Sequence, residues 1–196
     1  MRSNIEKLVS LRLNRVAPKA AKAATVTSWN VLSPDERKKA IESLVFISFA
    51  FETKLIQDPF EHSNENPPRP DVLTHIDDRE YFIELGEITD EALAKGIADS
   101  IRTKTVSGCA LSPEGPLAKM LRQKCEKRYE TGNAQVDLLL YYWRQSPYEE
   151  AIVEYLRANS LEIDKLLVNS QFTKIWIYDL DSETILWKTE KKEASR

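Results

Sequence analysis

The sequence predicts an α/β protein, a single three-layer domain in which a mixed central sheet lies between helices. Stretches with apolar residues at helical spacing alternate along the chain with short runs rich in β-branched and aromatic residues. One run, from Val136 to Trp143, is almost wholly apolar, which is typical of a strand covered on both faces of a sheet. A doubly covered strand among alternating helices and strands predicts helices on both sides of the sheet.

The composition is that of one ordinary globular domain with tails. The chain has 196 residues, 42% hydrophobic and 30% charged, with a net charge of −3. We predict a basic tail or short helix over residues 1–30, the α/β domain over 31–188 and a disordered tail over 189–196. The longest apolar run, residues 44–51, is shorter than a membrane span requires, so no membrane association is expected.

The cysteines and the N-terminal charge bear on compartment and partners. Cys109 and Cys125 are too few for a disulfide framework and are expected to be reduced thiols of a cytoplasmic protein. Residues 1–27 carry six Lys or Arg against the single Glu6. A solvated tail or packed helix is the plain interpretation of this segment, and a nucleic-acid-binding arm or an organellar transit peptide are the alternatives.

The first strong helix signal begins at Ser33. Ser33, Pro34 and Glu36 form the sequence pattern of a capping box with proline at the first helical position. Glu42 and Glu52 lie on this helix and could reach a site, although a lone charge on an amphipathic helix is generally solvated. The apolar series that predicts the helix is Ala40, Ile41, Leu44, Val45, Ile47, Ser48, Phe51 and Leu55.

A β-hairpin is predicted after the polar, Pro-rich loop of residues 57–69. The turn lies at Asp77 and Asp78, which sets Asp71 opposite Glu84 because both are equally far from the turn. Carboxylates directly opposed on one face of a hairpin destabilise it unless something compensates their charge, and a divalent cation is one such group. Alternation along the second strand turns Gly86 the same way as Glu84 and Glu87 the other way.

A second helix is expected to open at Ser112 and to stop near Gly132. Lys124 lies beside its apolar line and is the basic residue most suited to reach inward. The remaining basic residues of this helix are assigned to its solvated face: Lys119, Arg122, Lys127 and Arg128.

The C-terminal part is predicted to return to the sheet. A capping pattern at Ser146 opens a helix that ends near Ala158, and a further short helix covers residues 161–168. Two strands follow, over residues 172–178 and 184–187, with a turn between them. With a further short helix expected from Thr89, the whole order is helix, hairpin, helices, strand, helix, hairpin.

Within that order, the chain resembles the PD-(D/E)XK nuclease superfamily. The resemblance rests on Pro70-Asp71 followed thirteen positions later by Glu84-Leu85-Gly86, and on the Glu84-x-x-Glu87-hydrophobic pattern of some small members. It implies a restriction-endonuclease-like fold that acts on nucleic-acid phosphodiesters. It further implies Asp71 and Glu84 as ligands of Mg²⁺ or Mn²⁺, with the Leu85 carbonyl as an additional oxygen ligand.

The family's lysine, two residues after the acid, is replaced here by Gly86. Glu87 could take part through a strand distortion, Lys124 could supply the ammonium from the helix, or the site no longer catalyses. The alternative function is an inactive interaction or nucleic-acid-binding protein that keeps the fold, with Asp71 as a strand-entry cap and Glu84 on an exposed face. Candidate partners are nucleic acid, a second copy of the chain or another protein.

Overall fold

The structure is a computed structural model that describes residues 33–54, 60–63, 68–88, 114–142 and 149–192. The predicted basic tail or arm of residues 1–30, Cys109, and the helix starts at Ser112 and Ser146 lie outside these residues. None of the helices within the described ranges is long and apolar enough to cross a membrane.

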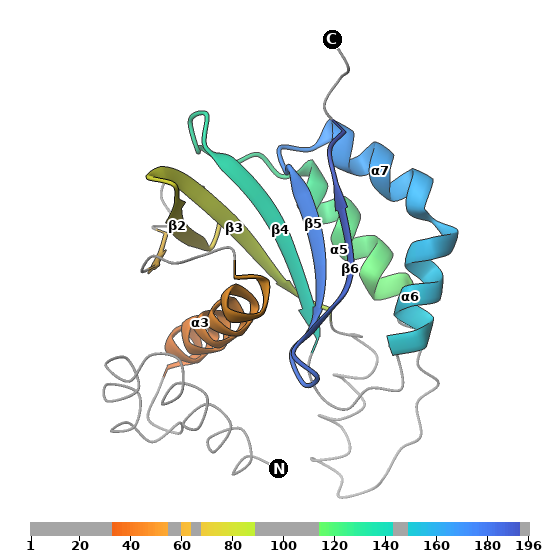
Figure 1. Ribbon diagram of the computed structural model, residues 1–196, viewed down its shortest axis with the longest axis horizontal. Coiled ribbons are helices and arrows are strands. Elements are labelled where there is room, and N and C mark those ends of the chain that lie inside the picture. Colours follow the sequence, from red (N-terminus) through yellow and green to blue (C-terminus); the bar gives the residue numbers. More distant parts are fainter. Residues whose placement is uncertain (1–32, 55–59, 64–67, 89–113, 143–148, 193–196) are drawn as a thin grey trace, which may run out of the picture.

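A six-stranded sheet forms the centre of the fold. Its strands lie in chain order across the sheet: β1 (Glu61–His62), β2 (Val72–Ile76), β3 (Arg79–Glu87), β4 (Gln135–Tyr142), β5 (Lys174–Asp179) and β6 (Thr184–Glu190). β3, β4 and β5 run parallel, and the other neighbours pair antiparallel (Figure 1). The predicted mixed sheet is therefore confirmed.

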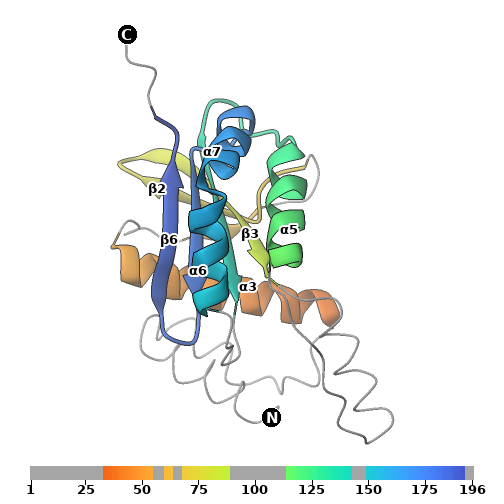
Figure 2. The same cartoon turned by 90° about the vertical axis from the view of Figure 1, so that its right-hand side faces the viewer.

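Helices cover both faces of this sheet. Leu138 and Leu140 of β4 pack toward one helical layer, whereas Leu139 and Tyr141 pack toward the other, so β4 is buried on both faces as predicted. Figures 1 and 2 show the two layers, α3 (Pro34–Thr53) on one side and, on the other, α5 (Glu114–Glu126), α6 (Glu149–Ala158) and α7 (Ser160–Asn169).

Helix α3 begins with the predicted capping box. The Glu36 amide donates to Ser33 Oγ, and the Ser33 amide donates to the Glu36 carboxylate at 2.7 Å. The buried face differs from the predicted apolar series at its end, because Phe49 is 1% exposed and Phe51 is 72% exposed. Phe49 is the last buried residue of α3, and Ala50 the last apolar one that packs against the core, before the helix ends at Thr53.

The hairpin of β2 and β3 has the predicted register. Ile76 pairs with Arg79 and Val72 with Ile83, so Asp71 and Glu84 are the next opposed positions. Asp77 and Asp78 both have positive φ, 51° and 61°, as the two central residues of a type I′ turn must. This turn matches the twist of the strands and fixes which residues share a face.

Helix α5 ends earlier than predicted. It stops at Glu126, and Gly132, the expected stop, lies in the following turn with φ of 61°. The intervening segment makes tertiary hydrogen bonds instead of helical ones, since the Glu130 amide donates to the Pro68 carbonyl at 2.9 Å. This link joins the end of α5 to the segment that enters the hairpin.

The sheet is also larger than predicted at its two edges. Residues 61–62, expected in a loop, form β1 and pair antiparallel with Val72 and Leu73. At the other edge, β6 continues through Glu190, past the boundary predicted at residue 188, and the Lys191 amide donates to the Thr173 carbonyl at 2.9 Å.

Candidate metal centre

Asp71 lies where β2 ends its pairing with β3. β3 runs on beyond Ile83 without a β2 partner, and the Leu85 amide donates to Asp71 Oδ2 at 2.8 Å. The carboxylate thus takes the place of the missing strand acceptor. Asp71 thus acts as a strand-entry cap, which is its role if the protein is inactive. The hydrogen bond from the Leu85 amide also fixes the position of the carboxylate oxygens.

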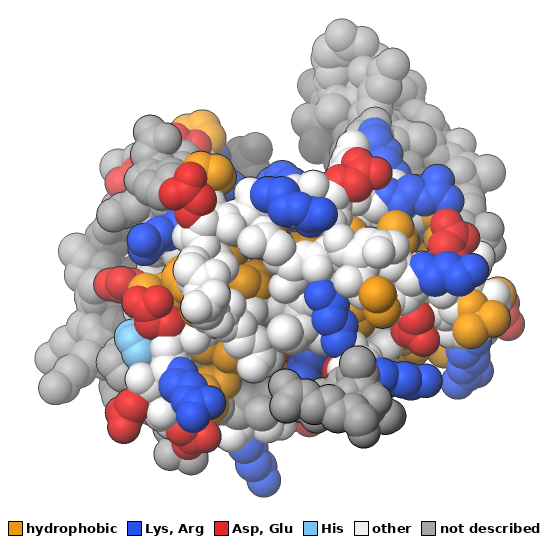
Figure 3. Space-filling view, turned by 90° about the horizontal axis from the view of Figure 1, so that it is seen from above, with side chains coloured by type: hydrophobic (Ala, Val, Ile, Leu, Met, Phe, Trp, Pro, Cys, Tyr) orange, Lys and Arg blue, Asp and Glu red, His pale blue; other side chains and the backbone are white. Residues whose placement is uncertain are grey.

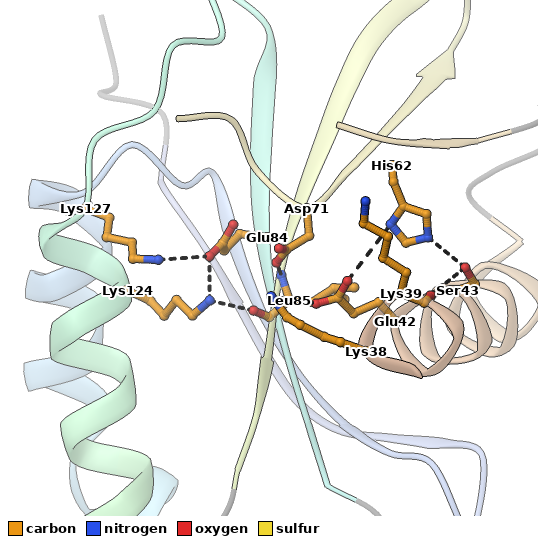
Figure 4. A network of polar contacts seen from close by, with 10 residues as sticks. All are labelled: Lys38, Lys39, Glu42, Ser43, His62, Asp71, Glu84, Leu85, Lys124 and Lys127. Carbon is orange, nitrogen blue, oxygen red and sulfur yellow. Dashed lines mark hydrogen bonds and ion pairs between the residues drawn. The ribbon is translucent and has the colours of Figure 1, made fainter. Parts of the chain in front are cut away.

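Glu84 projects from β3 toward α5. It does not lie on an exposed face, as it would if it had only a structural role. It is 3% exposed, and its Oε1 lies 2.5 Å from Lys124 Nζ and 3.6 Å from Lys127 Nζ (Figure 4). Lys127 is 56% exposed, as predicted for a solvated side chain, yet its ammonium also belongs to this cluster. Burying a carboxylate requires a compensating charge, and Lys124 of α5 and Lys127 just after it supply two.

The Lys124 ammonium stands between two oxygens of β3. Besides Glu84 Oε1 it contacts the Leu85 carbonyl oxygen at 2.6 Å, and its side chain is only 18% exposed. Lys124 therefore reaches inward as predicted. These are two of the three oxygens that the family resemblance assigns to a cation, so the ammonium occupies a position suited to positive charge.

Gly86 faces the same helix, and its surroundings explain its identity. A Cβ built at Gly86 would meet Leu140 Cδ2 at 2.7 Å, Met120 Sδ at 3.0 Å and Lys124 Cε at 3.4 Å. Leu140 of β4 and Met120 of α5 leave no room for a side chain at Gly86 without a shift. The stem of Lys124 lies at ordinary contact distance from the same point.

The electrostatics of Asp71 reflect an acidic site. The pKa of Asp71 is raised from 3.8 to about 7, chiefly by burial and next by the neighbouring Glu84 charge, against the opposing effects of Lys124 and the Leu85 amide. A carboxyl with such a pKa binds a proton readily near neutral pH, and a cation would displace that proton.

Glu87 lies on the other face of β3. It is paired in register with Tyr141, and the pairing of β3 with β4 is regular through Glu87, without the distortion that would turn it toward Glu84. The pKa of Tyr141 is raised by burial and next by Glu87, which places the two side chains together. The sequence offered Glu87 and Lys124 as replacements for the missing lysine. The structure places Lys124 beside Glu84 and Glu87 on the opposite face of β3.

Glu42 is a carboxylate that the sequence assigned to solvent, and it is buried near the same site. It is 7% exposed, lies 3.4 Å from Lys38 Nζ, and is among the charges that raise the pKa of Asp71. It shares a helical stripe with Val45 and Phe49, three and seven residues on, so helical spacing was the signal that could have found it.

His62, which had no recognisable partner in the sequence, connects β1 to α3. Its Nε2 lies 2.8 Å from Ser43 Oγ and its Nδ1 lies 4.0 Å from Glu42 Oε2 (Figure 4). Ser43 Oγ also donates to the Lys39 carbonyl one helical turn earlier, so the hydroxyl is committed to its own helix. We assign the three residues to a structural contact that holds Glu42 in place.

The oxygens at this centre suit a hard divalent cation. Asp71, Glu84 and the Leu85 carbonyl are oxygen donors, and Mg²⁺ is commonly held by one or two carboxylates while it keeps waters and substrate oxygens. Among the described residues, no group of three or more His, Cys, Asp and Glu side chains is placed to hold a metal ion. A cation at this centre would therefore need water or phosphate oxygens besides the two carboxylates and the carbonyl.

The basic residues of α5 and of the segment just after it mostly make contacts within the protein. Arg122 pairs with Glu162 at 2.8 Å, and Arg128 donates to the Asn169 carbonyl at 3.3 Å. The face of the molecule seen in Figure 3 carries basic and acidic side chains interspersed, without a continuous basic surface.

No family model, curated protein or solved structure matches this chain.

Proposed function

We propose that this protein is a divalent-cation-dependent nuclease of restriction-endonuclease-like type that acts on nucleic-acid phosphodiesters. The observation that carries the proposal is the convergence of Asp71, Glu84 and Lys124. Two acids come from one hairpin and an ammonium from α5, with Lys124 Nζ 2.5 Å from Glu84 Oε1. This is the residue set that the chemistry of phosphodiester hydrolysis uses.

Each group has a role in that chemistry. A cation held by Asp71 and Glu84 would stabilise charge on the phosphoryl oxygens and activate a water. Asp71 would hold the cation as a carboxylate, without its proton. Lys124 would then be free of its ion pair with Glu84 and could donate hydrogen bonds to the attacking water or to a phosphoryl oxygen.

Calorimetric titration with Mn²⁺ tests the cation site directly. We expect wild-type protein to bind Mn²⁺, and Asp71→Ala and Glu84→Gln to lose that binding. Glu80→Gln is the matched control, because Glu80 is an exposed acid on the same strand. If the wild type does not bind Mn²⁺ or Mg²⁺, the proposal is wrong.

Cleavage assays with plasmid and single-stranded substrates test the reaction. We expect Lys124→Met to keep Mn²⁺ binding and to lose cleavage, whereas Lys119→Met, an exposed change on the same helix, keeps both. Equal cleavage by wild type and Glu84→Gln would point to a contaminating nuclease.

One observation favours a non-catalytic interaction protein as a second candidate. The Lys124 ammonium already neutralises Glu84 without a cation, through contacts of 2.5 Å to Glu84 Oε1 and 2.6 Å to the Leu85 carbonyl. In an inactive descendant such an ion pair would simply stabilise the fold. That candidate predicts no cleavage by the wild type and no gain of stability on addition of Mn²⁺.

A further inference from the structure

Tyr129 presents a buried hydroxyl that has no hydrogen-bond partner among the described residues. The residue is 7% exposed, and its hydroxyl oxygen is shielded from solvent. An unpaired buried hydroxyl destabilises the folded state, so its presence in a folded protein requires an explanation. A group that pairs with it only when the site is loaded would provide one.

The hydroxyl belongs to the surroundings of Glu84. Lys127 Nζ lies 3.6 Å from Glu84 Oε1 and 5.9 Å from the centroid of the Tyr129 ring, so a single ammonium connects the ring to the carboxylate. Burial raises the pKa of Tyr129, and the charge of Glu84 and a hydrogen-bonding interaction with the same carboxylate raise it next. The hydroxyl therefore stands near the Glu84 carboxylate but outside ordinary hydrogen-bond geometry.

The main chain holds Tyr129 at this place. Its amide donates to Gln171 Oε1 at 2.6 Å, and Gln171 Nε2 donates to the Tyr129 carbonyl at 3.0 Å. The next residue, Glu130, donates to the Pro68 carbonyl at 2.9 Å, three residues before Asp71. These bonds join Tyr129 to the segment between α7 and β5, and its neighbour Glu130 to the segment that carries Asp71.

We propose that Tyr129 is a positioning residue for the cation site, whose hydroxyl donates a hydrogen bond to Glu84 when a cation draws that carboxylate away from Lys124. The inference rests on the proposed function, since it concerns the loaded state of the same site. Carboxylates that ligate metals are themselves hydrogen-bonded, and those bonds orient them. The donor is already in place and gives up no other hydrogen bond on loading.

Tyr129→Phe separates this role from a structural one. The variant keeps the ring under Lys127 and removes only the hydroxyl. In the absence of cation its free energy of unfolding is expected to equal or exceed that of the wild type, because an unpaired buried group is lost. Its Mn²⁺ affinity, measured by calorimetry, is expected to fall about 10- to 100-fold. Tyr178→Phe is the control, since Tyr178 is a buried tyrosine in the core between the sheet and α3.

The outcomes distinguish this inference from the function on which it rests. If wild type and Tyr129→Phe bind Mn²⁺ equally well, the inference is overturned and the cation site stands. If Tyr129→Phe unfolds more easily than the wild type without cation, the hydroxyl has a structural role and the inference is again overturned. If the wild type does not bind Mn²⁺, the proposed function fails and the inference with it.

Discussion

Replacing Asp71 by Asn should remove a pH dependence from the stability of the cation-free protein. The pKa of Asp71 is raised in the folded protein from 3.8 to about 7, chiefly by burial and then by Glu84. Between these values the folded state holds a proton that the unfolded chain has lost, so stability falls as the pH rises. Asn is uncharged and keeps an oxygen that can accept from the Leu85 amide.

The size of the effect follows from this shift. From about pH 5 to about pH 7 the folded protein holds nearly one extra proton, and each pH unit is worth ~1.4 kcal/mol. The stability of Asp71→Asn minus that of the wild type should therefore rise by about 3 kcal/mol from about pH 5 to about pH 8. Other titrating groups contribute to both proteins and largely cancel in this difference.

Urea unfolding followed by tryptophan fluorescence at several pH values measures that difference. Parallel stability curves for wild type and Asp71→Asn would refute the reasoning, because they would show that Asp71 ionises alike in both states. Mn²⁺ gives a second arm at about pH 8. Mn²⁺ at a hundred times its dissociation constant should stabilise the wild type by about 2.7 kcal/mol and leave Asp71→Asn unchanged.

Three further predictions concern the same centre. Lys124→Met should cost about 3 kcal/mol of unfolding free energy because it leaves the buried Glu84 charge without its nearest partner, and adding Glu84→Gln should recover most of the loss in a double-mutant cycle by urea unfolding. Gly86→Ala should cost about 1–3 kcal/mol by thermal unfolding, since its Cβ would meet Leu140 at 2.7 Å; an unchanged Tm would contradict this contact. Asp78→Gly should raise stability by about 0.5–1 kcal/mol, as glycine adopts its φ of 61° without strain, and a decrease would argue against the turn.

Local patterns were sufficient to predict the hairpin and the start of α3. The turn at Asp77 and Asp78 determines every pair in β2 and β3, so one local feature sets Asp71 against Glu84. The Ser33 capping box is likewise complete within four residues. Neither depends on which elements later pack together.

Tertiary packing decided the features that the sequence did not predict. Helical spacing places Glu42 in one stripe with Val45 and Phe49, but tertiary packing decided that this stripe faces the sheet and buries the carboxylate. The helix α5 does not extend to Tyr129, because the amide and carbonyl of Tyr129 form hydrogen bonds with Gln171, more than forty residues further along the chain. Such long-range hydrogen bonds compete with helix propagation and leave no local pattern.

The position of the ammonium follows from how closely α5 lies against β3. A lysine at residue 86 would require space for a Cβ, and Leu140 and Met120 leave none. Lys124 approaches from the helix instead, and its Cε lies 3.4 Å from the place that a Cβ at residue 86 would take. Because residues 86 and 124 are thirty-eight positions apart, the strand pattern alone does not reveal the ammonium, which the folded chain holds 2.5 Å from Glu84.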